Sequence, residues 1–415
     1  MRAILPVVLL ALCAACSSDG QDDAAGAGGG ATSTTTTSSD ASSSRASSAS
    51  TASTTASTAS AGGGGGGVGG SGGAPAALTF TAPVLASTTV GGRLVAADDL
   101  DGDGIVDLVV AGSNGSLGTL LGNGDGTFTD GPVQSSDTGT NAMQLGDFDD
   151  DGILDVMTAN AEDGIHVSLG AGDGSFAPSI KTAIMFGARS AAAADLDGDG
   201  NLDVVATVDH GISTVQVLKG NGDGTFVALS SYPAHEATEV VIGDFDGDGI
   251  LDLVVTRFAQ SSELSLLRGV GDGTFSAAID IAFPFDPGTL HAVDLDGDGA
   301  LDLVVAIAGA GFWVVRGNGD GTFQPADQYT PSDECEYAAS ADLDADGHVD
   351  LVVTDNVGAL EFVRGPGGAP FVDTQLTFVG PRPIGLALGD FDADGLVDVA
   401  FADGSYVYVS LNASR

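Results

Sequence analysis

Short apolar runs rich in Val and Leu alternate with stretches of Asp and Gly from residue 76 to the end of the chain. Leu108–Val110, Leu253–Val255 and Leu303–Val305 are three such runs, each bounded by turn-forming residues. Runs of this length and composition are typical of strands that are buried on both faces. The runs lack helical spacing, and the 64 glycines would weaken helices. The pattern therefore predicts an all-β domain of short strands.

Two motifs repeat through this region with a period of 48 to 50 residues. The acidic motif Asp-x-Asp-x-Asp-Gly-x-x-Asp begins at residues 99, 147, 195, 244, 294, 342 and 390. A Gly-rich motif that ends in Phe occupies 122–128, 170–176, 220–226, 269–275 and 317–323, with a degenerate copy at 365–371. Asn-Gly and Asp-Gly favour tight hairpin turns, because these turns need positive φ angles. We expect the recurrent Phe to lie in the core, and the Asp of the turn to stabilise the turn.

A unit of about 48 residues with four short strands matches one blade of a β-propeller. Seven units predict a seven-bladed β-propeller over residues 76–415. The chain ends in Val407–Asn412, which resembles the strand before a Gly-rich turn, whereas Leu78–Val84 resembles the segment after such a turn. We therefore expect residues 77–85 to complete the seventh blade beside the terminal strand. This closure leaves no exposed sheet edge in the ring.

The acidic motif has the pattern of a calcium-binding loop. It places carboxylates at positions 1, 3, 5 and 9 and a glycine at position 6, where a sharp turn is needed. Position 7 would contribute its backbone carbonyl, so its side chain is free to vary. Calcium suits these oxygen ligands better than magnesium, which retains more water, and zinc is disfavoured because no loop contains Cys. The sequence therefore predicts up to seven calcium ions. Their ligands would be Asp99, Asp101, Asp103, Ile105 and Asp107; Asp147, Asp149, Asp151, Ile153 and Asp155; Asp195, Asp197, Asp199, Asn201 and Asp203; Asp244, Asp246, Asp248, Ile250 and Asp252; Asp294, Asp296, Asp298, Ala300 and Asp302; Asp342, Asp344, Asp346, His348 and Asp350; and Asp390, Asp392, Asp394, Leu396 and Asp398.

Position 12 of each loop lacks the Glu of an EF-hand, and the residues that follow are strand-like. Asp-rich loops between strands, together with the Gly-rich turn and its Phe, resemble the FG-GAP/VCBS repeats of integrin α-subunit propellers and of many bacterial surface proteins. The resemblance implies that the Asp positions coordinate calcium in β-hairpin loops. It also implies a role in interactions at a cell surface.

The amino-terminal residues read as a lipoprotein signal peptide, residues 1–16. The apolar run Ala3–Ala15 follows a single arginine and is too short to span a bilayer. Leu12–Cys16 resembles a bacterial lipobox, although Cys13 stands where that motif usually has Leu. An acylated Cys16 would anchor the protein in a membrane leaflet. The alternative is ordinary cleavage near Ala15 and release of a soluble protein.

Residues 17–75 consist almost entirely of Ser, Thr, Ala, Gly and Asp, which gives this segment nothing to bury. We expect a disordered tether that separates the folded domain from the membrane. Ser17 follows the acylated cysteine in place of the Asp that favours inner-membrane retention in enterobacteria. We therefore expect an extracytoplasmic, lipid-anchored protein at the outer membrane or cell surface. Once Cys16 is acylated and the signal is removed, Cys335 has no partner for an intramolecular disulfide.

The formal net charge is −45, and the seven loops contain 28 of the 57 acidic residues. Seven divalent ions would add 14 positive charges and leave about −31. Such a charge argues against nucleic acid and anionic lipid headgroups as partners. The five histidines lie at unrelated offsets in different repeats, which does not favour a catalytic group.

The favoured function is a non-catalytic, monomeric, calcium-stabilised surface module that binds protein or glycan. The alternative is a hydrolase or lyase that acts on polysaccharide at the propeller axis. Residues that break the repeat are the candidates for ligand contact, because binding sites on repeat folds usually lie in variable loops. They are Tyr232, His235, Arg257, Phe258, Phe312, Trp313 and Arg382.

Overall fold

The computed structural model describes residues 78–414, with gaps, and the residue pairs 12–13 and 51–52. The gaps are residues 88–90, 113–114, 136–139, 185–186, 209–213, 235–236, 258–262, 285, 308–309, 330–334, 336, 356–357, 366–373, 379 and 381. The predicted signal peptide, acylated cysteine and tether lie outside the described residues, apart from β1 (Leu12–Cys13) and β2 (Thr51–Ala52), which pair antiparallel. Within the described part of the chain, no helix is long and apolar enough to cross a membrane.

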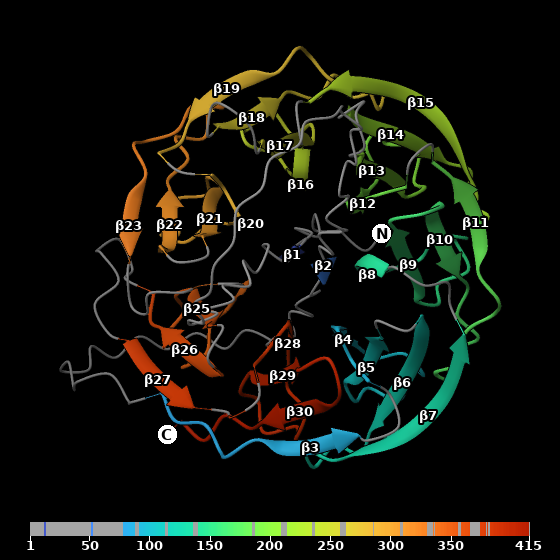
Figure 1. The fold of residues 1–415 in the computed structure, drawn as a ribbon, viewed down its shortest axis with the longest axis vertical. Coiled ribbons are helices and arrows are strands. Elements are labelled where there is room, and N and C mark those ends of the chain that lie inside the picture. Colours follow the sequence, from blue (N-terminus) through green and yellow to red (C-terminus); the bar gives the residue numbers. More distant parts are fainter. Residues whose placement is uncertain are drawn as a thin grey trace, which may run out of the picture.

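Seven four-stranded antiparallel sheets form a ring around a central axis (Figure 1). We number the sheets as blades 1 to 7, starting from the first complete sheet in the chain. Blades 1 to 3 contain β4 (Leu94–Asp98), β5 (Asp107–Ala111), β6 (Ser116–Gly122) and β7 (Phe128–Ser135); β8 (Thr140–Gly146), β9 (Asp155–Asn160), β10 (Gly164–Ser168) and β11 (Ile180–Ala183); and β12 (Ser190–Ala194), β13 (Asp203–Val208), β14 (Thr214–Gly220) and β15 (Phe226–Pro233). Blades 4 and 5 contain β16 (Ala237–Gly243), β17 (Asp252–Arg257), β18 (Glu263–Leu267) and β19 (Ile279–Ala282); and β20 (Thr289–Val293), β21 (Asp302–Ile307), β22 (Gly311–Val315) and β23 (Asp327–Tyr329). Blades 6 and 7 contain β24 (Tyr337–Ala341), β25 (Asp350–Thr354), β26 (Ala359–Val363) and β27 (Thr374–Phe378); and β28 (Gly385–Gly389), β29 (Asp398–Ala402), β30 (Val407–Ser410) and β3 (Val84–Ser87).

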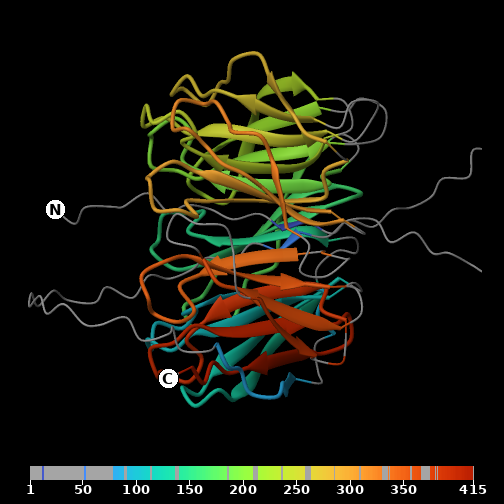
Figure 2. The ribbon, with the colours of Figure 1, turned by 90° about the vertical axis from the view of Figure 1, so that its left-hand side faces the viewer.

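The first strand of each blade faces the axis, and the fourth forms the outer rim (Figure 1). In a side view the blades form a disc with two faces (Figure 2). The second strands are almost entirely buried, as in β5, whereas the outer strand β7 is largely exposed. Apolar clusters of buried residues fill the seven joints between neighbouring blades. The sandwiched position of each blade explains why its inner strands are apolar on both faces.

The ring closes through blade 7, in which the amino-terminal strand β3 pairs with β30 near the carboxyl terminus. Val84 lies opposite Val409, and Phe80 forms a bridge with Asn412. Beyond the bridge, the N–H of Ala413 donates to the carbonyl of Thr79 at 2.7 Å. The predicted fold and its closure are confirmed, and β3 extends to Ser87, two residues further than the sequence indicates.

Candidate metal centres

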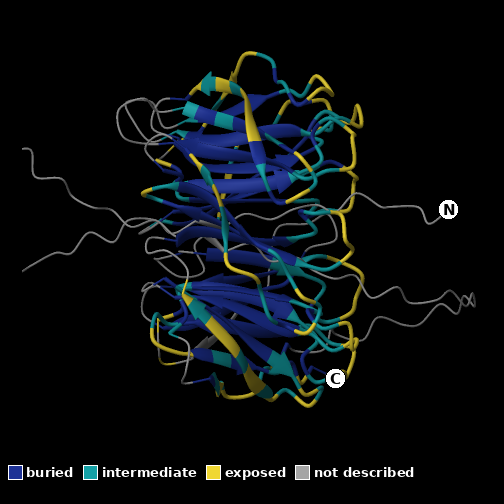
Figure 3. Ribbon diagram, turned by 90° about the vertical axis from the view of Figure 1, so that its right-hand side faces the viewer, coloured by how far each residue is buried: buried dark blue, intermediate teal, exposed yellow. Residues whose placement is uncertain are grey.

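The seven acidic loops all lie on one face of the disc. Each acidic loop connects the first and second strands of its blade, and each Gly-rich turn connects the third and fourth. Because the strands are antiparallel, both connections fall at the same end of the blade. Exposed residues are concentrated along one face of the disc, where the carboxyl terminus also lies (Figure 3). The loops and turns are therefore accessible to ions from solvent.

Within each loop, the first aspartate holds the backbone in a tight curve. In blade 1, Asp99 accepts hydrogen bonds from the N–H groups of Gly102 at 2.8 Å and Gly104 at 2.9 Å. The fifth-position Asp103 accepts from the N–H of Ile105 at 2.8 Å. Gly102 and Gly104 have φ angles of 77° and 87°, a region in which a side chain costs energy. The loop backbone is thus folded around its own carboxylates.

The ninth-position aspartate is buried and links the loop to the Gly-rich turn. Asp107 accepts from the N–H of Leu100 at 2.9 Å and from the N–H of Gly122 at 2.7 Å. The same pair of bonds occurs in all seven blades, with Asn412 in place of the glycine in blade 7. Burial disfavours the charged form, so it raises the pKa of these carboxyls. The pKa rises to about 6 for Asp107, Asp155, Asp252, Asp302 and Asp350, and to about 7 for Asp398.

The loops fit a bound divalent cation. In each of five loops, three carboxylates can place one oxygen each within 4.8 Å of the others. The three are positions 1, 3 and 9 in the loops that begin at Asp99, Asp147 and Asp294, and positions 1, 3 and 5 in those that begin at Asp195 and Asp244. Asp149 in blade 2 and Asp296 in blade 5 each have a buried Oδ1 that accepts no hydrogen bond. Carboxylate oxygens are hard ligands that suit a divalent cation, and such buried oxygens are available to one. The contribution of the position-7 carbonyls stays a prediction.

Comparison with known families decides the class of protein. A model of the FG-GAP-like repeat matches residues 99–158, 147–206, 195–255, 244–305, 294–353 and 342–401, which together cover most of the chain. The chain belongs to the FG-GAP-like repeat family. No protein of curated function matches the sequence.

Solved structures share the fold of this FG-GAP-like propeller. Two are described as crystal structures of BBS1N in complex with ARL6DN, one soaked with lead and the other with mercury. The first has a TM-score of 0.59 at 11% identity and covers 80% of this chain and 96% of its own. The second has a TM-score of 0.57 at 13% identity, with 81% and 96% coverage. At such low identity the similarity concerns the fold alone.

Four loops of the FG-GAP-like propeller contain a basic partner that the sequence analysis missed. The residue directly before the first glycine of the turn is basic in blades 3 to 6, and it contacts the third-position Asp of its own blade. The ion pairs are Lys219 with Asp197, Arg268 with Asp246 at 2.7 Å, Arg316 with Asp296 at 3.4 Å, and Arg364 with Asp344 at 2.6 Å. The corresponding residues in blades 1, 2 and 7 are Leu121, Leu169 and Leu411. The difference between Lys or Arg in four repeats and Leu in three is visible in the sequence and could have been recognised there.

In three joints of the described ring, the acidic loop of one blade contacts the Gly-rich turn of the next. The N–H of Gly126 in blade 1 donates to the carbonyl of Phe391 in the blade 7 loop at 2.9 Å. The aromatic rings of Phe391 and Phe128 meet edge to face, with centroids 5.6 Å apart. The same contacts join blades 2 and 3 and blades 4 and 5. The Phe of the turn therefore packs in the joint between two blades, which agrees with the predicted core position.

The aspartate of the Gly-rich turn stabilises that turn. Asp125 accepts hydrogen bonds from the hydroxyl and the backbone N–H of Thr127. Both bonds lower the pKa of Asp125, and the bond from the hydroxyl has the larger effect. Asp173, Asp223, Asp272 and Asp320 make the same bonds to the residue two positions later. The predicted structural role is confirmed in these five turns, whereas the degenerate copy at 365–371 lies almost wholly outside the described residues.

Several residues that break the repeat have structural roles. The hydroxyl of Tyr232 accepts from the N–H of Phe275 in the next blade at 2.7 Å. Trp313 is buried against Phe283, and Arg257 forms ion pairs on the rim of blade 4. Phe312 stacks on Tyr329, and Arg382 is exposed. His235 and Phe258 lie outside the described residues.

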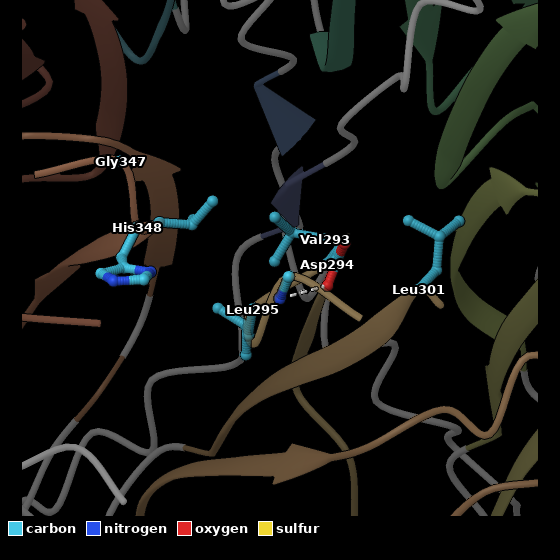
Figure 4. A pocket seen from close by; sticks show the side chains of 8 residues that line it. Val293, Asp294, Leu295, Leu301, Gly347 and His348 are labelled. Carbon is cyan, nitrogen blue, oxygen red and sulfur yellow. Dashed lines mark hydrogen bonds between the residues drawn. The ribbon is translucent and has the colours of Figure 1, made fainter. Parts of the chain in front are cut away.

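The described histidines are not gathered in one place. His291 on the innermost strand β20 contacts the hydroxyl of Ser340 on β24 at 2.7 Å, and burial lowers its pKa to about 3. His166 is buried beside Asp163, and His348 is exposed. His348 borders a hollow of about 320 Å³ between the loops of blades 5 and 6, where Val293, Leu295 and Leu301 provide apolar walls (Figure 4). His210 lies outside the described residues.

Proposed function

We propose that this FG-GAP-like protein is a calcium-stabilised interaction module that a lipid on Cys16 holds at the cell surface. Its seven loops would bind calcium, and its exposed faces would bind protein or glycan. The observation that carries the proposal is the repeated set of converging carboxylates on one face of the disc. Calcium would neutralise charges that otherwise repel each other in loops that also join neighbouring blades.

Two further observations favour a binding role over catalysis. Buried titratable groups of the innermost strands are engaged in joints between blades: Glu239 accepts from the N–H of Leu290 at 2.7 Å, and His291 contacts Ser340. A structurally similar propeller is described in a complex with a second protein, ARL6DN, which shows that this fold can present a protein-binding surface. A non-catalytic module is therefore the function that these contacts support best.

Thermal unfolding tests the role of calcium. If free calcium is ten times the dissociation constant, each site contributes about 1.4 kcal/mol, and seven independent sites contribute roughly 10 kcal/mol. Melting of the full chain should therefore move to a much lower temperature when EDTA replaces calcium, and magnesium at the same concentration should restore little of the loss. An equal melting temperature in calcium and in EDTA would contradict the proposal.

Fractionation tests the anchor separately. The full chain, expressed in a bacterium that acylates lipoproteins, should sediment with membranes, and Cys16→Ser should move it to the soluble fraction. Cys335→Ser is the matched control, because it removes a buried thiol of the propeller and leaves the proposed anchor intact. Identical partition of the wild type and Cys16→Ser would place the anchor elsewhere. Exposure at the surface should make the membrane-bound propeller accessible to antibody on intact cells.

A further inference from the structure

The identity of one residue divides the seven acidic loops into two classes. Blades 3, 4, 5 and 6 have Lys or Arg directly before the first glycine of the Gly-rich turn, and blades 1, 2 and 7 have Leu. This residue lies at the end of the third strand or directly after it. The third strand lies beside the second and so brings the side chain over the loop of its own blade. The three Leu blades are neighbours in the ring and include the blade that closes it.

In the basic class, the third-position carboxylate is already neutralised by a side chain. Arg364 lies 2.6 Å from Asp344, whose side chain is only 3% exposed, and Arg268 lies 2.7 Å from Asp246, which is 8% exposed. Lys219 contacts Asp197 and also lies 2.8 Å from Asp199, so it bridges two predicted ligands of one loop. These cations occupy the carboxylates that calcium would need.

In the Leu class, the third-position carboxylate has no such compensation. Among the described residues, no Lys or Arg lies within ion-pair distance of Asp101, Asp149 or Asp392. A buried Oδ1 that accepts no hydrogen bond occurs in both classes, at Asp149 and at Asp296, so the classes differ in the neighbouring cation and not in hydrogen bonding. A divalent cation therefore relieves more repulsion in these loops than in the basic class.

We propose that Lys219, Arg268, Arg316 and Arg364 are built-in counter-ions that make blades 3 to 6 weak calcium sites and leave blades 7, 1 and 2 as the tight ones. The inference rests on the proposed calcium binding. Calcium must displace the basic side chain from the third-position carboxylate, or share that carboxylate with it, in the basic class only. A hydrogen-bonded ion pair, such as those of Lys219 and Arg268, changes the dissociation constant by about tenfold or more. Complete removal of calcium then weakens the closing arc of the ring most, because the other four loops keep their own cations.

Calcium titration of the calcium-free full-length protein, by calorimetry and by flow dialysis, tests this assignment. We expect three tight and four weak sites. Lys219→Leu introduces the residue that blades 1, 2 and 7 use, so it should convert one weak site and give four tight sites. Lys181→Leu is the matched control: it removes the same charge from a pair with Asp163, away from the acidic loops, and should leave three tight sites.

A reciprocal variant protects the test against a folding failure. Leu169→Lys places a cation over the blade 2 loop and should reduce the tight sites to two. If Lys219→Leu does not fold by circular dichroism, Arg316→Leu and Leu169→Lys decide the question by the same count. Seven indistinguishable sites, or unchanged counts in these variants, would overturn the two classes and leave calcium binding intact. A wild-type protein that binds no calcium would instead contradict the proposed function itself.

Discussion

The carboxylate of Asp398 accepts a 2.6 Å hydrogen bond from the backbone N–H of Asn412. Asn412 stands where the other blades have the first glycine of the Gly-rich turn, and Asp107 makes the equivalent bond to Gly122. In blade 7, however, the turn is absent, and Asn412 instead forms a bridge with Phe80 at the other end of the domain. The last acidic loop is therefore tied directly to the segment that closes the ring.

Deletion of residues 76–86 should cause aggregation or a large loss of stability. It removes most of β3 and the bridge at Phe80, and so exposes the edge of β30. Deletion of residues 20–70 serves as the control and should leave the melt nearly unchanged, because that segment has the composition of a tether. Differential scanning calorimetry in calcium measures both variants. Equal tolerance of the two deletions would contradict the closure.

The closure was predictable because it depends on repeat register. The alignment of the terminal strand with His166–Gly170 places Asn412 at a defined point of the blade, and the structure has it there. The same register correctly gives the blade count, the hairpin turns and the convergence of carboxylates in the loops. A period of this length specifies which residues are equivalent, and equivalent residues make equivalent backbone bonds.

Contacts that depend on side-chain reach were not predictable in the same way. Lys219 and Asp197 are 22 residues apart, and they meet because the end of β14 lies over the loop that precedes β13. Tyr232 reaches Phe275 across a joint between blades, and His291 reaches Ser340. The contacts of Tyr232 and His291 each belong to one blade, so the repeat pattern does not specify them. The basic residue beside the third-position Asp recurs in four blades, so the repeats show its position but not its partner.

Asp252→Asn should destabilise the calcium-free protein by about 1–3 kcal/mol, because both carboxylate oxygens of Asp252 accept backbone N–H groups and an amide nitrogen cannot. Asp248→Asn, in the same loop, should cost much less, since its exposed side chain keeps the oxygen that accepts from Ile250. Both variants should lose calcium affinity at this loop. Urea unfolding in EDTA, together with calcium titration, separates the two roles. Equal loss of calcium-free stability in the two variants would argue against the buried link.

Ala393→Gly should stabilise the protein, and Gly102→Ala should destabilise it, each by about 0.5–1 kcal/mol. Both residues occupy the fourth loop position, where φ is 58° for Ala393 and 77° for Gly102. A Cβ at Gly102 would meet nothing within 4 Å, so the effect is conformational and not a clash. Urea unfolding in saturating calcium measures the two changes. If both substitutions stabilised the protein, or both destabilised it, the left-handed backbone conformation could not be the cause of the two effects.

His291→Gln should remove part of the acid sensitivity of the fold. The folded pKa of His291 is lowered to about 3 by burial, below the ordinary value of 6.5. Between these values the unfolded chain binds a proton that the folded chain does not, so stability is lost as the pH falls below about 6.5. The loss reaches about 2 kcal/mol at pH 5, given about 1.4 kcal/mol for each pH unit.

Gln144 occupies the same place in blade 2 and makes two hydrogen bonds to the backbone of Ala193, so glutamine is compatible with this position. From pH 7.5 to pH 5 in fixed calcium, the free energy of unfolding of His291→Gln should therefore gain about 2 kcal/mol relative to wild type. Gln144→His should show the opposite trend, and a difference between His291→Gln and wild type that does not change with pH would contradict the burial of a neutral histidine.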